Sequence, residues 1–133
     1  MIFVDASALI AIITGESDAG ELADRLEAER QRFCSALSVW ETVAGLVKSY
    51  TFSVPTARSH VGGFLEDGNL KFVGIGEREY EIAAEAYAQY GKGRHPAALN
   101  MGDCFAYACA KANRAKLLFK GNDFSKTDIV TRT

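Results

Sequence analysis

Four acidic residues of this sequence stand where predicted strands end or predicted helices begin: Asp5, Glu41, Asp103 and Asp123. Crowded carboxylates repel one another and lose hydration, so a cluster of them favours a bound divalent cation. Oxygen ligands with few nitrogen or sulfur partners suit Mg²⁺, with Mn²⁺ as a substitute. Such an ion can activate water and clamp the oxygens of a phosphodiester. The pattern therefore favours metal-assisted hydrolysis of a phosphodiester.

Helix capping explains the same acids without any metal. Two of them end a capping-box pattern, in which a polar residue at the helix start pairs with an acid three residues later. These patterns are Ser38-x-x-Glu41 and Asn100-x-x-Asp103. Asp5 also stands where it could cap a helix, and Asp123 where it could be an ordinary turn residue. Spacing alone leaves both interpretations open.

The elements that would position these acids alternate between short apolar strands and amphipathic helices. Strands are expected at residues 2–4, 33–35, 70–73 and 117–119, with a further one at 129–130. Helices are expected over 7–13, 18–29, 38–50, 55–65, 77–90 and 100–113, with turns at 67–69 and 121–122. This alternation predicts an α/β fold with a mainly parallel sheet, whose functional residues gather where strands end.

Bulk composition indicates one globular domain over residues 1–133, with 48% hydrophobic and 24% charged residues. Three cysteines without regular spacing argue against a disulfide framework, and two histidines are too few for a zinc site. We expect Cys34, Cys104 and Cys109 to be reduced and buried. No secretory signal pattern and no apolar run of membrane-spanning length is found, so a cytoplasmic protein is expected.

Charge is distributed unevenly, although the net charge is only -2. Residues 1–89 contain 7 basic and 14 acidic residues, a net charge of -7, whereas residues 90–133 contain 8 basic and 3 acidic ones, a net charge of +5. A basic segment on an acidic body suits a polyanion or an acidic partner. An ordinary hydrated basic surface explains the distribution equally well.

Four segments resemble the PIN domain, and specifically the VapC-type toxins. They are I-F-V-D-A-S-A-L-I, S-V-W-E-T, L-N-M-G-D-C-F-A-Y-A-x-A-K and L-L-F-K-G-N-D-F-x-x-T-D-I. The match covers essentially the whole chain in the expected order. The resemblance implies a PIN-like three-layer α/β/α domain with a central parallel sheet.

The same resemblance implies the toxin of a type II toxin–antitoxin system. Such a toxin is a Mg²⁺-dependent endoribonuclease that cuts selected cellular RNA, often tRNA or rRNA. Its implied partners are a VapB-type antitoxin, a second copy in a homodimer, and promoter DNA in a higher complex with the antitoxin. Two alternatives stay open: a module that binds RNA or protein with purely structural acids, and a PIN nuclease of RNA maturation.

Carried over by position, Asp5, Glu41 and Asp103 match the acids of the family, and Asp5 and Asp103 would be the metal ligands. Asp123 would be a fourth catalytic acid. Many PIN domains carry a further acid where this chain has Gly121, so the number of metal ions stays open.

Supporting roles are assigned to polar residues near the acids, each with a simpler alternative. Ser7 would hydrogen-bond Asp5 or water, or would be only a helix-start hydroxyl. Asn100 would support the metal-bound water, or would be a plain helix cap. Arg94 and Lys120 would contact RNA phosphates, or be hydrated surface residues. Trp40 is expected in the core or in an antitoxin groove.

Overall fold

A four-stranded parallel sheet forms the centre of the molecule in the computed structural model, which describes residues 1–121 and 123–129. The strands are β1 (Ile2–Val4), β2 (Arg32–Cys34), β3 (Lys71–Phe72) and β4 (Lys116–Leu118), in the order β3-β2-β1-β4. Phe3 of β1 pairs with Phe33 on one side and with Leu117 on the other. The predicted parallel sheet is confirmed.

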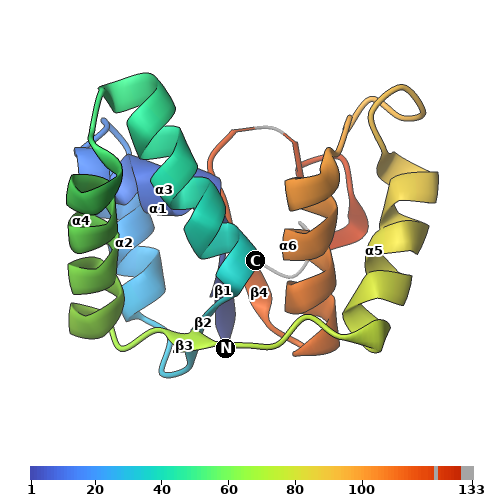
Figure 1. Ribbon diagram of the computed structural model, residues 1–133. Helices are drawn as coiled ribbons and strands as arrows, with labels where there is room; N and C mark the ends of the chain where they lie inside the picture. Colours follow the sequence, from blue (N-terminus) through green and yellow to red (C-terminus); the bar gives the residue numbers. More distant parts are fainter. Residues whose placement is uncertain (122, 130–133) are drawn as a thin grey trace.

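Within residues 1–121 and 123–129, six helices cover the two faces of this sheet. They are α1 (Ala6–Thr14), α2 (Ala19–Glu27), α3 (Ala36–Tyr50), α4 (Val54–Asp67), α5 (Glu77–Tyr90) and α6 (Met101–Ala112). Helices α1 to α4 lie on one side of the strands, and α5 and α6 lie on the other (Figure 1). The three-layer α/β/α arrangement is therefore confirmed.

The alternating side chains of the central strands divide the core into two parts. Phe3 and Leu117 pack with α5 and α6, whereas Ile2, Val4 and Leu118 pack with the other four helices. All five side chains are at most 2% exposed. Such strands, apolar on both faces, are typical of a parallel sheet covered on both sides.

Most predicted elements lie within two or three residues of their expected bounds, and two expectations fail. Helix α3 begins at Ala36 rather than Ser38, because Ser35 is its cap. The expected strand at 129–130 is wrong at Ile129, whose N–H bonds the Thr127 hydroxyl at 3.3 Å within a 3₁₀ turn. Residues 122 and 130 lie outside the described residues.

The three cysteines were predicted to be reduced and buried, and no apolar run to be long enough to cross a membrane. Cys34, Cys104 and Cys109 are free and buried, as predicted, and burial raises the pKa of each thiol to about 11 or 12. None of the helices in the described part of the chain is long and apolar enough to span a bilayer.

Candidate active site

Asp5 follows β1 directly and caps the N-terminus of α1. It is 5% exposed, and its Oδ2 accepts hydrogen bonds from the Ser7 backbone N–H at 3.0 Å and the Ser7 hydroxyl at 2.6 Å. Its own N–H donates to the carbonyl of Leu118 at 2.9 Å, which places it where β1 and β4 end. Burial raises the pKa of Asp5, and the bonds from Ser7 offset part of that rise.

Asp103 lies in the first turn of α6 and is also nearly buried. The predicted capping box with Asn100 is confirmed: the Asn100 N–H donates to Asp103 Oδ2 at 3.1 Å, and the Asp103 N–H donates to Asn100 Oδ1 at 2.9 Å. Burial raises the pKa of Asp103 to about 7, with further contributions from the charges of Asp5 and Asp123. Its capping bond to Asn100 acts in the opposite direction.

Glu41 lies in the second turn of α3, and its predicted capping box with Ser38 is wrong. The box that forms joins Ser35 and Ser38, because the helix begins at Ala36. The carboxylate of Glu41 instead turns toward α6, where it lies against the Cα of Gly102. Burial raises the pKa of Glu41 to about 7, and the charges of Asp5 and Asp103 add to that rise.

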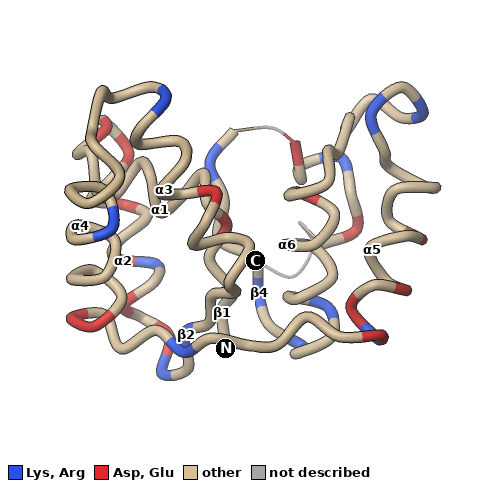
Figure 2. Tube along the Cα trace, viewed as in Figure 1, with Lys and Arg blue, Asp and Glu red and all other residues tan. Residues whose placement is uncertain are grey.

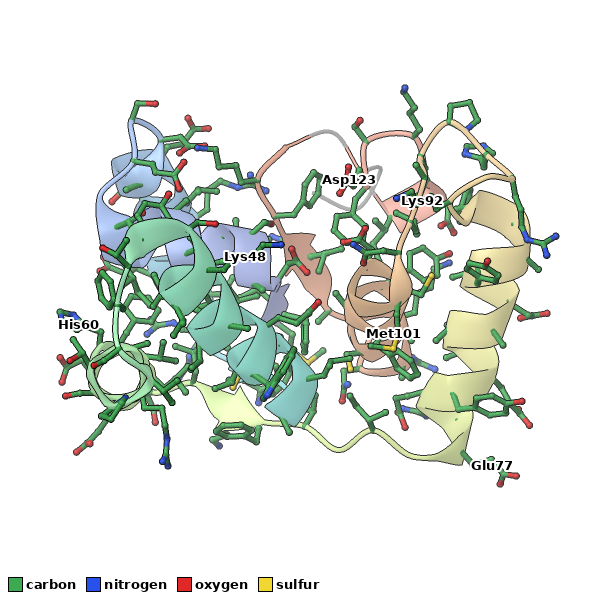
Figure 3. The ribbon with its side chains drawn as sticks, turned by 45° about the horizontal axis from the view of Figure 1, so that its top comes forward. Lys48, His60, Glu77, Lys92, Met101 and Asp123 are labelled. Carbon is green, nitrogen blue, oxygen red and sulfur yellow. The ribbon has the colours of Figure 1, made fainter. Side chains whose placement is uncertain are left out.

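Asp123 is an exposed residue on the loop after β4. Figure 3 shows it between the α1 side and the α5–α6 side of the molecule. It forms a side-chain hydrogen bond with Asp103, and its charge raises the pKa of Asp5 and Asp103. Gly121 has a φ of +97°, which disfavours the acid that many PIN domains carry there.

These four acids, Asp5, Glu41, Asp103 and Asp123, are named the carboxylate cluster. They come from four separate segments, and their charges act on one another. None of the ion pairs found among residues 1–121 and 123–129 involves a member of the cluster. Burial without a cationic partner favours the protonated, uncharged form of a carboxyl group. A bound divalent cation would reverse this preference and favour the charged carboxylate.

The donor set fits a hard divalent cation, since it consists of carboxylate oxygens without histidine or thiolate. In the described part of the chain, no three acidic, histidine or cysteine side chains are already grouped as a finished metal site. Residue chemistry therefore fits Mg²⁺ or Mn²⁺, with side-chain adjustment on binding.

Ser7 connects the cluster to the segment that follows β4. Its hydroxyl donates to Asp5 and accepts a hydrogen bond from the backbone N–H of Lys120 at 3.0 Å. The Lys120 ammonium pairs with Glu16 and lies 3.3 Å from Asp18, so its charge is already compensated. These contacts hold the end of β4 beside Asp5.

Arg94, for which RNA contact was predicted, and Asp128 make contacts with residues outside the cluster. Arg94 lies on the loop after α5, where its guanidinium is 5.3 Å from the centre of the Tyr87 ring. Basic residues gather on this loop, whereas acids line much of α5 (Figure 2). Asp128 accepts a hydrogen bond from the Tyr107 hydroxyl at 2.6 Å and pairs with Lys111, a structural role.

Trp40 is not a core residue, because 66% of it is exposed. It lines an apolar groove of about 580 Å³ between α3 and α4. The other lining residues are Ala36, Val39, Val43, Ala44, Val47, Val54, Arg58 and Phe72. Trp40 is the neighbour of Glu41 in the chain, but the groove faces α4, whereas the Glu41 carboxylate faces α6.

Comparison with known proteins places this chain in a known family. The family model of the PIN domain matches residues 2–130, and the chain belongs to the PIN domain family. Its relatives include ribonuclease VapC30 of Mycobacterium tuberculosis, 41% identical over 128 residues that cover 96% of this chain and 95% of the relative. VapC ribonuclease R02377 of Rhizobium meliloti is 39% identical, with 97% and 99% covered.

A solved structure shares the fold. The crystal structure of Mycobacterium tuberculosis VapC20, described as a sarcin-ricin loop cleaving toxin, has a TM-score of 0.72 to this chain. Identity is 20%, and the alignment covers 94% of this chain and 93% of VapC20. The predicted PIN-like fold is confirmed by this likeness, and the predicted VapC resemblance by the more similar relatives.

Two contacts of the site were missed in the sequence. The close approach of Glu41 to Gly102 was signalled only by a glycine inside the first turn of a helix, where glycine is unfavourable. The pairing of Lys120 with Glu16 and Asp18 joins segments more than 100 residues apart and has no local signal.

Proposed function

We propose that this chain is the toxin of a type II toxin–antitoxin system and acts as a Mg²⁺-dependent endoribonuclease, with Mn²⁺ as a substitute. The carboxylate cluster carries the proposal. Buried Asp5 and Asp103 and half-buried Glu41 have raised pKa values and no ion-pair partner among the described residues. Relatives about 40% identical over nearly the whole chain are named VapC ribonucleases, which supports cleavage of RNA.

Each acid has a distinct role in this proposal. Asp5 and Asp103 would hold the ion, Glu41 would position it or the attacking water, and Asp123 would add a fourth carboxylate. A divalent ion supplies a more acidic water and a clamp on phosphate oxygens. Ser7 orients the Asp5 carboxylate through its 2.6 Å hydrogen bond.

Asn100 has the corresponding role for Asp103. Its N–H fixes one carboxylate oxygen, and its own side chain fixes the start of α6. The rigid helix start therefore determines where the Asp103 carboxylate lies. Precise placement of this kind is what a catalytic constellation needs, since small displacements are costly in rate.

The proposed substrate is cellular RNA such as tRNA or rRNA, with Arg94 contacting phosphates, and with Lys120 doing so only by exchanging its pairing with Glu16 and Asp18 for a phosphate. The proposed partners are a VapB-type antitoxin, a second copy in a homodimer, and promoter DNA bound through the antitoxin, all in the cytoplasm. The apolar groove beside Trp40 supports the antitoxin contact, because an exposed apolar groove suits an apolar protein segment.

Replacing Asp5 by Asn tests the function. Asn keeps the shape and capping capacity of the side chain but removes its charge. We expect Asp5→Asn to abolish cleavage of total cellular RNA in metal-depleted buffer with Mg²⁺ restored, while the melting temperature stays close to that of the wild type. Mapping of 5′ ends after brief expression would identify the sites that only the wild type cuts.

Asp67→Asn provides the matched control, because Asp67 is an exposed acid at the end of α4. This variant should cleave like the wild type. Full activity of Asp5→Asn would refute the proposal. Intact RNA with every metal, combined with RNA binding, would favour a binding module whose acids are only helix caps; cleavage confined to precursor RNA would favour a maturation nuclease.

A further inference from the structure

The first turn of α6 contains a glycine, Gly102, directly before Asp103. Glycine in the interior of a helix lowers the stability of that helix, relative to alanine, by up to about 1 kcal/mol. The presence of a glycine at position 102 therefore needs an explanation outside the helix. The reason lies on α3. A Cβ atom at position 102 would stand 1.8 Å from Oε2 of Glu41, 2.5 Å from its Cδ and 2.7 Å from its Oε1. Real Cβ atoms essentially never come within 3.0 Å of heavy atoms in residues that are not their chain neighbours.

We propose that Gly102 is a positioning residue: the absence of a side chain there lets the carboxylate of Glu41 reach across from α3 and lie beside Asp5 and Asp103. The inference rests on the proposed nuclease function, in which Glu41 is a member of the carboxylate cluster. Gly102 itself contacts neither metal nor RNA. It acts through Glu41.

A small shift of Glu41 would not relieve the clash, because all three atoms of its carboxyl group lie too close to a Cβ at position 102. A methyl group at 102 requires the whole end of the side chain to rotate. Glu41 is only half-buried, so it can turn toward solvent at little cost to the fold. An alanine at 102 therefore removes one acid from the cluster while leaving the helices packed.

Other helical glycines of the described residues lack this feature. A Cβ at Gly45 would meet Ile10 Cδ1 at 2.6 Å, the end of a flexible apolar side chain. A Cβ at Gly63 would meet nothing within 4 Å. Gly63 on α4 thus provides the matched control, since Gly63→Ala makes the same chemical change in open space.

The test compares Gly102→Ala with Gly63→Ala in the full chain. Isothermal titration of the metal-depleted protein with Mn²⁺ gives the dissociation constant, and RNA cleavage gives the rate. We expect Gly102→Ala to weaken Mn²⁺ binding and slow cleavage by about 10- to 100-fold, as loss of a ligand-orienting contact does. Its melting temperature should match or exceed that of the wild type, and Gly63→Ala should bind and cleave like the wild type.

A second background separates positioning from a structural effect. With Glu41→Ala already in place, Gly102→Ala should weaken Mn²⁺ binding no further, since the displaced carboxylate is gone. Equal losses in both backgrounds would overturn the proposal, as would a Gly102→Ala protein with wild-type affinity and rate. If Gly102→Ala fails to fold, recovery of the fold by Glu41→Ala supports the clash, and no recovery overturns it.

Failure of the proposed function is distinguishable from failure of this inference. A wild-type protein that neither binds Mn²⁺ nor cleaves RNA refutes the nuclease, whatever Gly102 does. A crystal structure of Gly102→Ala then decides the positioning role by itself. The Glu41 carboxyl turned into solvent supports the role, and the same carboxyl still resting against position 102 overturns it.

Discussion

At the scale of single residues, capping and ligand roles coincide in this site. Asp5 caps α1, and Asp103 belongs to the capping box of α6. Helix caps are held by backbone hydrogen bonds, which fix the carboxylate in space. A cap at the end of a parallel strand is therefore a rigid place from which to present an oxygen ligand.

Ser7→Ala tests how much of that rigidity comes from one hydroxyl. The variant loses the hydrogen bond from the Ser7 hydroxyl to Asp5 and leaves the Lys120 N–H without its acceptor. We expect the free energy of unfolding to fall by about 1–2 kcal/mol, the cost of an unmade buried hydrogen bond. Since the bond from the Ser7 hydroxyl lowers the pKa of Asp5, its loss should also weaken Mn²⁺ binding measured by titration at pH 7, although the backbone N–H of residue 7 still donates to Asp5.

Ser53→Ala is the comparison for this prediction. Ser53 caps α4, and its hydroxyl accepts from the Thr56 N–H at 3.2 Å, far along the chain from the cluster. It should lose up to about 1 kcal/mol of stability with unchanged Mn²⁺ affinity. Equal Mn²⁺ affinities of the Ser7 and Ser53 variants would contradict an orienting role for Ser7.

At the scale of elements, the start of α3 determines what Glu41 does. Ser35 and Ser38 exchange hydrogen bonds of 3.1 Å and 3.0 Å, so the capping box closes one turn before Glu41. A capping box uses the residue three positions after the cap, which is Ser38, so Glu41 stands too far into the helix to bond its start. Glu41 is thereby free to face α6.

Ser35→Ala should therefore lower the free energy of unfolding, whereas Glu41→Gln should not. Loss of the Ser35 cap should cost about 1 kcal/mol of unfolding free energy. Glu41→Gln removes a half-buried carboxyl whose pKa is raised to about 7, so in chelator the unfolding free energy at pH 8 should stay equal or rise. Urea denaturation measures both, and a destabilised Glu41→Gln with a neutral Ser35→Ala would restore the capping interpretation.

Features set by residues close together in the chain were predictable from the sequence, and features set by distant segments were not. Strands, helices and the Asn100–Asp103 box were predictable, because period, turn residues and caps are local signals. Two serines three residues apart offered two start points for α3, and the sequence does not rank them. The approach of Glu41 to Gly102 depends on the crossing of two helices, and no local pattern contains that geometry.

At the scale of the whole molecule, ion pairs between the two parts of the chain compensate some of its uneven charge. Lys116 pairs with Glu29 at 3.0 Å, and Lys120 pairs with Glu16 and Asp18, so basic residues of the second part meet acids of the first. The carboxylate cluster is left out of this pairing. Its uncompensated acids make the stability of the metal-free protein depend on pH in an unusual direction.

The direction follows from proton linkage. Asp5, Glu41 and Asp103 have folded-state pKa values raised above those of an unfolded chain, up to about 7 for Glu41 and Asp103. Between about pH 5 and pH 8 the folded state therefore binds more protons than the unfolded state, and stability falls as pH rises. Lowered pKa values of Glu16, Glu29 and Glu79 act below this window, where their contribution is lost on acidification.

We expect the metal-free protein to lose on the order of 1–3 kcal/mol of unfolding free energy between pH 5 and pH 8, measured by urea denaturation in chelator. Asp103→Asn should flatten this dependence, because it removes one titrating group. Mg²⁺ competes with the same protons, so its stabilisation should grow with pH and reverse the trend. A metal-free protein that becomes steadily more stable from pH 5 to pH 8 would show that the cluster is not desolvated, and would remove the electrostatic reason for a cation there.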